Sequence, residues 1–355
     1  MSKRERNVNI DLTKCIAVLG VISVHFFLNN KFYEVPVQGE RMYLMMAMRT
    51  AFMVCVPLFL ITTGFLMSEK KLSLRYYKGI PHTLFIYLAA SFCCMAVVHF
   101  KETPYTWHTA IQDLIDFTGA PYAWYVEMYI GLFLLIPFLN LIYRNLEGKR
   151  QKQILILTLF VLTSLTSLIN TSSYFVPAYW LHTYPLLYYF IGCYLKEYPV
   201  QWKRKHVLLL FFGLWVALCA AFNIYRSGGG KYEWGMYADW YGFENVISAS
   251  LLFAWLQSLS INRMPGILKK VLACVSRISL GIYLVSWIFD QKFYEILNTK
   301  VPVMTDRLFY YFVIVPAVFF CSFLTALLLD WIYRLLQITL SWAIRKIRIA
   351  REKKI

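Results

Sequence analysis

Long apolar stretches alternate with short polar connectors along the whole chain. A helix that crosses a bilayer needs about 20 consecutive, mostly apolar residues. Ten stretches come near that length, the sixth being the weakest: 10–28, 49–67, 80–99, 124–143, 153–170, 180–195, 206–224, 244–260, 271–289 and 308–337. The pattern predicts an all-α, polytopic membrane protein with about ten transmembrane helices. Since no Ser- or Pro-rich linker divides the chain, we expect a single integral-membrane domain over residues 1–355.

The basic residues gather in every second connector. The N-terminal segment, the connectors at 70–78, 144–152, 196–205 and 263–270, and the C-terminal tail hold about three times as many Lys and Arg as the other connectors. The positive-inside rule assigns this set to the cytoplasm, which places both termini there and requires an even number of spans. The net charge of +17 then reflects contact with membrane lipid headgroups, and no nucleic acid is needed as a partner.

The composition supports the membrane class and narrows the chemistry. Hydrophobic residues make up 59% of the chain, too many for an ordinary soluble domain. All eight cysteines fall inside predicted spans, where we expect them to pack as small apolar side chains. The sequence contains no HExxH or CxxC spacing, so we expect no metal. It carries no signal for the oligomeric state.

Three ionisable residues share one face of the first predicted helix. At about 100° per residue, Lys14 and His25 differ by about 20° and Asp11 and His25 by about 40° around the helix axis. Ionisable groups inside a membrane segment are costly and usually face the interior of a bundle. Lys14 and His25 are about 16 Å apart along the axis, so a cation near one surface is aligned with a titratable base deep in the protein. A buried histidine that only makes a structural hydrogen bond is the alternative.

Further charged residues lie close to predicted span ends. Arg49 is expected at a depth similar to that of His25, where it would orient the base, hold an anionic acceptor group or stabilise an oxyanion, or else snorkel to the interface. Arg75 and Lys78 are three residues apart at the cytoplasmic side, a spacing that suits either phosphate binding or membrane anchoring. Glu127 is a candidate partner for Arg49 or an interfacial side chain.

Five blocks in chain order resemble the acyltransferase 3 family of ten-helix membrane O-acyltransferases. The first helix contains the Asp-Leu pair, the basic residue and the histidine of that family, here Asp11, Lys14 and His25. The other four blocks are VPLFLITTGFL at 56–66, RYYKGIP at 75–81, WYVEMYIGLFLLIP at 124–137 and SLGIYL at 279–284. Together they are spread over most of the chain.

The resemblance implies acyl-CoA on the cytoplasmic side and a glycan acceptor at or beyond the outer face. It implies that His25 is the essential base, with Arg75 and Lys78 at the acyl-CoA entrance. We expect Arg49 and, indirectly, Asp11 to assist catalysis, and Lys14 to help hold the coenzyme phosphates. Residues expected at the acceptor are Trp124, Glu127 and Tyr283.

Two departures from the family pattern affect the expected site. Lys14 and Lys78 stand where many members have arginine, which keeps the charge but loses the bidentate geometry. Ser286 stands where the family has a histidine after its IYL motif, which leaves His25 with one candidate partner fewer.

The sequence therefore predicts a multi-pass O-acyltransferase of a bacterial cell membrane. It would move an acetyl or other short acyl group from coenzyme A, with acetyl-CoA as donor, to a hydroxyl of a surface polysaccharide or lipid-linked glycan. Direct transfer and transfer through an acyl-histidine both stay open. The main alternative is a transporter or flippase of a lipid-linked glycan that uses the same polar face; a catalytically dead membrane scaffold is a third.

Overall fold

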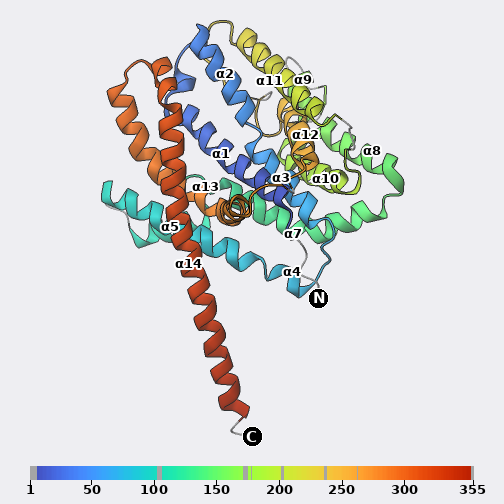
Figure 1. Ribbon diagram of the computed structural model, residues 1–355, viewed down its shortest axis with the longest axis vertical. Helices are drawn as coiled ribbons and strands as arrows, with labels where there is room; N and C mark the ends of the chain where they lie inside the picture. Colours follow the sequence, from blue (N-terminus) through green and yellow to red (C-terminus); the bar gives the residue numbers. More distant parts are fainter. Residues whose placement is uncertain are drawn as a thin grey trace.

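The computed structural model describes residues 6–101, 106–170, 175–176, 178–200, 204–235, 238–261 and 263–352, and these ranges are helical without any named β-strand. Figure 1 shows the helices gathered into one bundle from which the end of α14 projects. The α-helices are α1 Val8–Asn29, α2 Glu40–Phe52, α3 Cys55–Met67, α4 Leu74–Tyr77, α5 Ile80–Lys101, α6 Trp107–Ile115, α7 Trp124–Asn145, α8 Gly148–Phe160, α9 Thr166–Ile169, α10 Tyr184–Glu197, α11 His206–Ser227, α12 Phe243–Ser258, α13 Gly266–Lys300 and α14 Tyr311–Glu352. Short 3₁₀ turns at Phe32–Glu34, Ala178–Thr183 and Met304–Tyr310 and a π-helical turn at Val161–Leu165 complete the order.

The all-α membrane class predicted from the sequence is confirmed. Each of the ten apolar segments forms helix, and 8 helical stretches in the described part of the chain are long and apolar enough to cross a membrane. Helices α10 and α12 have only 14 and 16 residues, below the length of a full span. The number of ten spans and the cytoplasmic location of both termini stay predictions.

The second predicted segment is divided into two helices. Helix α2 ends at Phe52 and α3 begins at Cys55, just before Pro57. The ring of a proline clashes with the carbonyl of the residue four positions earlier, here Met53, so the break falls at the position where a continuous helix is least tolerated. As a result Arg49 lies in the last turn of α2, close to the interruption between the two helices.

Helices α3 and α10 approach each other most closely through two glycines. A Cβ atom on Gly64 would overlap the carbonyl of Tyr189, and one on Gly192 would overlap that of Ile61. Small residues at such positions let membrane helices pack backbone to backbone. This contact fixes α3, which carries Val56 and Thr63 toward the interior of the bundle.

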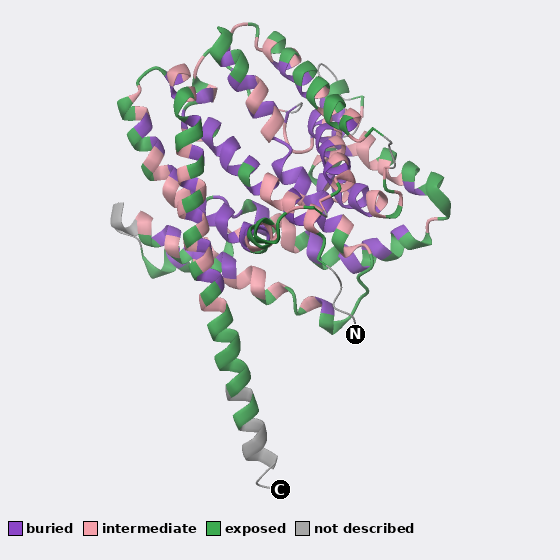
Figure 2. Cartoon of the chain, viewed as in Figure 1, coloured by how far each residue is buried: buried purple, intermediate pink, exposed green. Residues whose placement is uncertain are grey.

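Helix α1 lies at the centre of the bundle and positions the candidate site. It packs against α13, α3 and α2, and hydrophobic clusters cover it on two sides. Figure 2 shows its residues mostly buried, whereas the projecting end of α14 is exposed. An ionisable residue on α1 therefore faces other helices, as the polar stripe predicts.

Candidate active site

The base predicted from the sequence is paired with an acid that was not predicted. His25, in the last two turns of α1, is buried, and its Nδ1 lies 3.4 Å from Oδ2 of Asp290 in α13. The Asp290 side chain is completely buried. A carboxylate beside Nδ1 stabilises a charged imidazole ring and leaves Nε2 as the nitrogen that can accept a proton.

Two further residues hold this pair in place. The Tyr122 hydroxyl donates to Oδ2 of Asp290 at 2.9 Å, and its ring lies over the His25 ring with 3.8 Å between centroids. Asn29 donates to the His25 carbonyl at 2.8 Å and to the Tyr122 hydroxyl at 3.3 Å. Tyr122 precedes α7, and burial holds the pKa of its phenol well above the usual value, so it remains a donor. His25, Asp290 and Tyr122 thus form one polar unit.

His25 opens onto a cavity with aromatic walls, which we name the outer cavity. It has a volume of about 380 Å³ and lies toward the end of α1 that the charge pattern assigns to the outer face. Trp124, Trp234 and Trp240 line it together with Tyr122. Among the described residues that line it, His25 alone has an ionisable nitrogen or a carboxylate, so it is the candidate for acid–base chemistry in this cavity.

A second cavity, the inner cavity, lies toward the beginning of α1. Its volume is about 190 Å³, half that of the outer cavity, and Lys14, His82 and Arg277 bring basic groups to its wall. It is also lined by three residues that carry hydroxyl groups, Thr63, Ser276 and Ser279. The inner cavity is therefore basic and polar, unlike the outer one.

The two cavities meet at a shared wall. Val21 of α1, Val56 of α3 and Tyr283 of α13 line both of them. Tyr283 is predicted to contact the acceptor; its ring lies 6.1 Å from that of His25. The face of α1 that carries Lys14 and His25 thus runs along both cavities, as the spacing of the two residues predicts.

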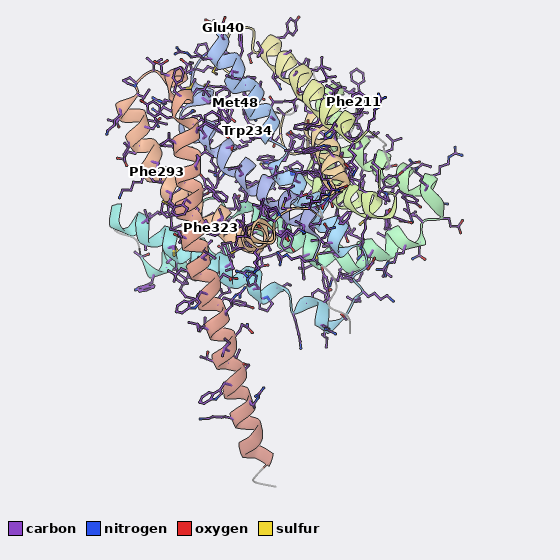
Figure 3. All side chains as sticks on the ribbon, in the orientation of Figure 1. Glu40, Met48, Phe211, Trp234, Phe293 and Phe323 are labelled. Atoms are coloured by element: carbon purple, nitrogen blue, oxygen red, sulfur yellow. The ribbon has the colours of Figure 1, made fainter. Side chains whose placement is uncertain are left out.

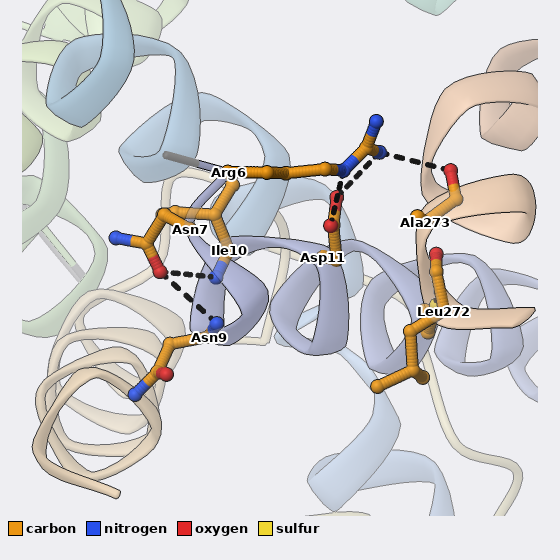
Figure 4. Close-up of polar contacts among 8 residues, drawn as sticks. Arg6, Asn7, Asn9, Ile10, Asp11, Leu272 and Ala273 are labelled. Carbon is orange, nitrogen blue, oxygen red and sulfur yellow. Dashed lines mark hydrogen bonds and ion pairs between the residues drawn. The ribbon is translucent and has the colours of Figure 1, made fainter. Parts of the chain in front are cut away.

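A third, open pocket leads from the inner cavity toward the start of α1. Lys14, Ser276 and Arg277 line both, and Asp11 and Arg6 join them in the outermost part. Figure 4 shows the side chain of Arg6 bound to Asp11, with Nε 2.5 Å from Oδ2, and to the Ala273 carbonyl at 2.9 Å. Asp11 therefore neutralises Arg6 at this mouth, and it does not contact His25.

The start of α1 is fixed by a local signal. The side chain of Asn7 accepts hydrogen bonds from the backbone N–H groups of Asn9 and Ile10, which Figure 4 also shows. Asparagine is a preferred N-cap because it satisfies the free N–H groups of the first turn. The cap sets where the helix begins and so the depth of Asp11 and Lys14.

Arg49 is fully buried in an aromatic cage beside the outer cavity. Its Nε and Nη1 donate to the hydroxyls of Tyr33 at 3.2 Å and Tyr232 at 3.1 Å. Its guanidinium also lies 5.0 Å from the ring centroid of Trp234, which is labelled in Figure 3 and lines the outer cavity. Nη2 has no hydrogen-bond partner among the described residues. No carboxylate of the described residues forms an ion pair with this buried guanidinium, an arrangement that is costly and makes Arg49 a functional candidate.

Three predicted site residues lie away from both cavities. Glu127 is exposed on the first turn of α7, and the hydrogen-bond partners of Arg49 are Tyr33 and Tyr232 instead. Arg75 and Lys78 are exposed around α4, and neither lines the inner cavity. Trp124, by contrast, lines the outer cavity, where the prediction of acceptor contact expects it.

The sequence analysis missed Asp290 and Arg277. The ninth apolar segment was expected to end at residue 289, but α13 continues to Lys300, so Asp290 lies inside the helix. It follows Ser286 by one helical turn, and a carboxylate one turn beyond the position of the family's histidine is the signal that could have found it. Arg277 lies in the same segment, two residues before the SLGIYL block.

No cluster of three metal-ligating side chains occurs among the described residues. A family model described as an acyltransferase domain matches residues 7–327, which is nearly the whole chain. No curated protein and no solved structure matches it.

Proposed function

Because the chain belongs to the acyltransferase 3 family, we propose that it is an O-acyltransferase that joins a cytoplasmic donor to an outer acceptor within the membrane. The donor is acyl-CoA, with acetyl-CoA the first candidate. The acceptor is a hydroxyl of a cell-surface polysaccharide or of its lipid-linked precursor. His25 is the general base and Asp290 is the residue that orients it.

One observation supports this proposal above the others: His25, backed by Asp290 at 3.4 Å, lines the outer cavity one helical turn from Val21, which belongs to the wall shared with the chemically different inner cavity. The inner cavity has the cations that coenzyme phosphates require. The outer cavity has the aromatic walls on which sugar rings stack. An enzyme that brings an anionic thioester and a sugar together needs both, whereas a transporter needs no base at their meeting point.

The chemical step follows from the position of the base. Nε2 of His25 takes the proton of the acceptor hydroxyl while the oxygen attacks the thioester carbonyl carbon. The resulting tetrahedral intermediate collapses by breaking the carbon–sulfur bond. The imidazolium returns the proton to the departing thiolate, which gives the ester and free coenzyme A. Asp290 stabilises the imidazolium during this transfer, and Tyr122 keeps Asp290 in position.

The two ends of the cavity system then divide the recognition. Lys14 contributes to donor binding in the inner cavity, and Arg75 and Lys78 act before the donor enters, by attracting anions to the cytoplasmic surface. Arg49 belongs to the acceptor side through Trp234, and its free Nη2 is available for an anionic acceptor group or the developing oxyanion. Asp11 acts only at the mouth, through Arg6.

The direct test uses acetyl-labelled coenzyme A and membranes that contain equal amounts of wild-type protein or His25→Ala. We expect label in the glycan or lipid fraction with wild type, and a loss of about 10²–10⁴-fold in the variant, the usual contribution of a general base. Size-exclusion chromatography in detergent checks that the variant is folded. Label retained in folded His25→Ala would reject the mechanism. Movement of a lipid-linked glycan without coenzyme A would favour a flippase.

A further inference from the structure

An ionic cluster of unequal charge borders the inner cavity. Asp330 of α14 is 7% exposed at its side chain and has three basic neighbours. Its Oδ2 lies 3.3 Å from Nη2 of Arg277 and 2.9 Å from Nε of Arg334, and its Oδ1 lies 4.0 Å from Nε2 of His82. Two guanidinium groups share one carboxylate, so the cluster carries excess positive charge.

The two arginines face different surroundings. Arg277 lines both the inner cavity and the pocket that leads to it, and His82 lines the inner cavity. Arg334 lines neither. The excess charge of the cluster is therefore presented to the cavity through Arg277, next to Lys14 on the opposing helix α1.

The geometry of Arg277 suits a ligand in the cavity. A guanidinium has five N–H donors in a planar arrangement. Nη2 is the atom that contacts Asp330, and the described residues supply no hydrogen-bond partner for the other nitrogens. The side chain is 39% exposed, so these donors can be reached, while the carboxylate of Asp330 fixes the plane of the group. Arginine held in this way binds phosphate oxygens in a bidentate manner.

We propose that Arg277 binds a phosphate group of the acyl-CoA donor and that Asp330 positions it for this contact. The proposal rests on the function given above and makes the inner cavity and its mouth the donor site. A phosphate at Arg277 lies on the same side of the shared wall as Lys14, with Tyr283 between it and His25. The acyl end of the donor then points along α1 toward the base, which is about 16 Å from Lys14.

The same chemistry would suit the phosphate of a lipid headgroup. The pocket at the mouth is open, and an anionic lipid carries a phosphate of similar charge. The two sources differ in one respect that an experiment can use. A coenzyme phosphate changes the affinity for the soluble donor, whereas a lipid phosphate changes the dependence of the protein on anionic lipid.

The test measures KM and kcat with acetyl-CoA and with acetyl-pantetheine, which has the thioester arm but no phosphate. Arg277→Gln should raise the KM for acetyl-CoA by about 10–100-fold, the loss of a hydrogen-bonded charge contact, with kcat within about threefold. The same variant should leave the KM for acetyl-pantetheine unchanged. Arg334→Gln is the matched control because it removes the other arginine of the cluster, and its KM should change less than about threefold.

Three results would overturn the proposal. They are an unchanged KM for acetyl-CoA in Arg277→Gln, an equal rise for acetyl-pantetheine, and an equal rise in Arg334→Gln. If Arg277→Gln differs from wild type in activity only in nanodiscs with anionic lipid, and not in nanodiscs of neutral phosphatidylcholine, Arg277 is assigned to a lipid instead. If His25→Ala abolishes transfer while Arg277→Gln leaves KM intact, the enzyme function stands and this assignment alone fails.

Discussion

The inner and outer cavities share a wall but differ in almost every other property. The inner one is small and basic, with Lys14, His82 and Arg277 on its surface. The outer one is twice as large and aromatic, with Trp124, Trp234 and His25 as characteristic members. Both are lined by the same helices, α1, α3 and α13.

The difference fits the proposed function, in which one helix bundle serves two unlike substrates. A phosphate-bearing donor needs charge that is held in place, and ion pairs such as Arg277 with Asp330 supply it. A sugar needs flat apolar faces and a few polar groups, which tryptophan supplies without a net charge. His25 lines the outer cavity close to the shared wall, so in the proposed function the chemistry occurs only where both substrates reach.

The largest effect is expected from removing the negative charge beside His25. Asp290→Asn keeps the shape of the side chain but removes the charge that stabilises the His25 imidazolium. We expect kcat to fall by about 10²-fold or more while both KM values stay near those of wild type, measured by steady-state transfer of labelled acetyl groups. Tyr122→Phe should have a smaller effect, because it removes only one hydrogen bond to Asp290, and kcat should fall by less than about tenfold. A loss in Tyr122→Phe as large as that in Asp290→Asn would contradict this order.

A smaller effect should show that the two cavities bind different substrates. Trp234→Leu removes an aromatic wall of the outer cavity and uncovers Arg49. It should raise the KM for the acceptor by about tenfold and leave the KM for acetyl-CoA unchanged, the opposite of what is expected for Arg277→Gln. Kinetics with each substrate varied in turn measure this. Equal changes in both KM values would show that the cavities are not specialised.

The smallest effect is expected at the cytoplasmic surface. Arg75→Gln combined with Lys78→Gln removes two exposed charges that do not line the inner cavity. We expect a rise of only about two- to threefold in the KM for acetyl-CoA at low salt, lost at about 0.5 M salt because exposed charges are screened there. A rise that persists at high salt would place these residues in direct contact with the donor.

The helical fold and the shared face of the first helix were predictable from the sequence for a physical reason. Periodicity along one helix is a local property, so the shared face of Lys14 and His25 could be worked out from residue spacing, and each residue lines one of the two cavities. The division between α2 and α3 falls just before Pro57, a residue type that interrupts helices and can be read from the sequence. Apolar length also identified the helical segments, of which 8 stretches among the described residues are long and apolar enough to cross a membrane.

The partners of these residues were not predictable in the same way. Asp290 reaches His25 from a helix 265 positions later in the chain, and residue spacing gives no information about such a contact. Arg277 carries the same charge as the many residues that anchor the connectors, so only its place on the cavity wall separates it from them. Arg75 and Lys78 are exposed and line neither cavity, and their role at the acyl-CoA entrance stays a prediction.

The proposed mechanism requires that the donor enters from the cytoplasmic side and reacts with an outer acceptor at His25. Sealed membrane vesicles of defined orientation test it most directly, because labelled acetyl-CoA does not cross a bilayer. We expect labelled glycan with inverted vesicles, none with intact right-side-out vesicles, and none with His25→Ala in either orientation. Labelling of intact right-side-out vesicles at the rate of inverted ones would contradict it.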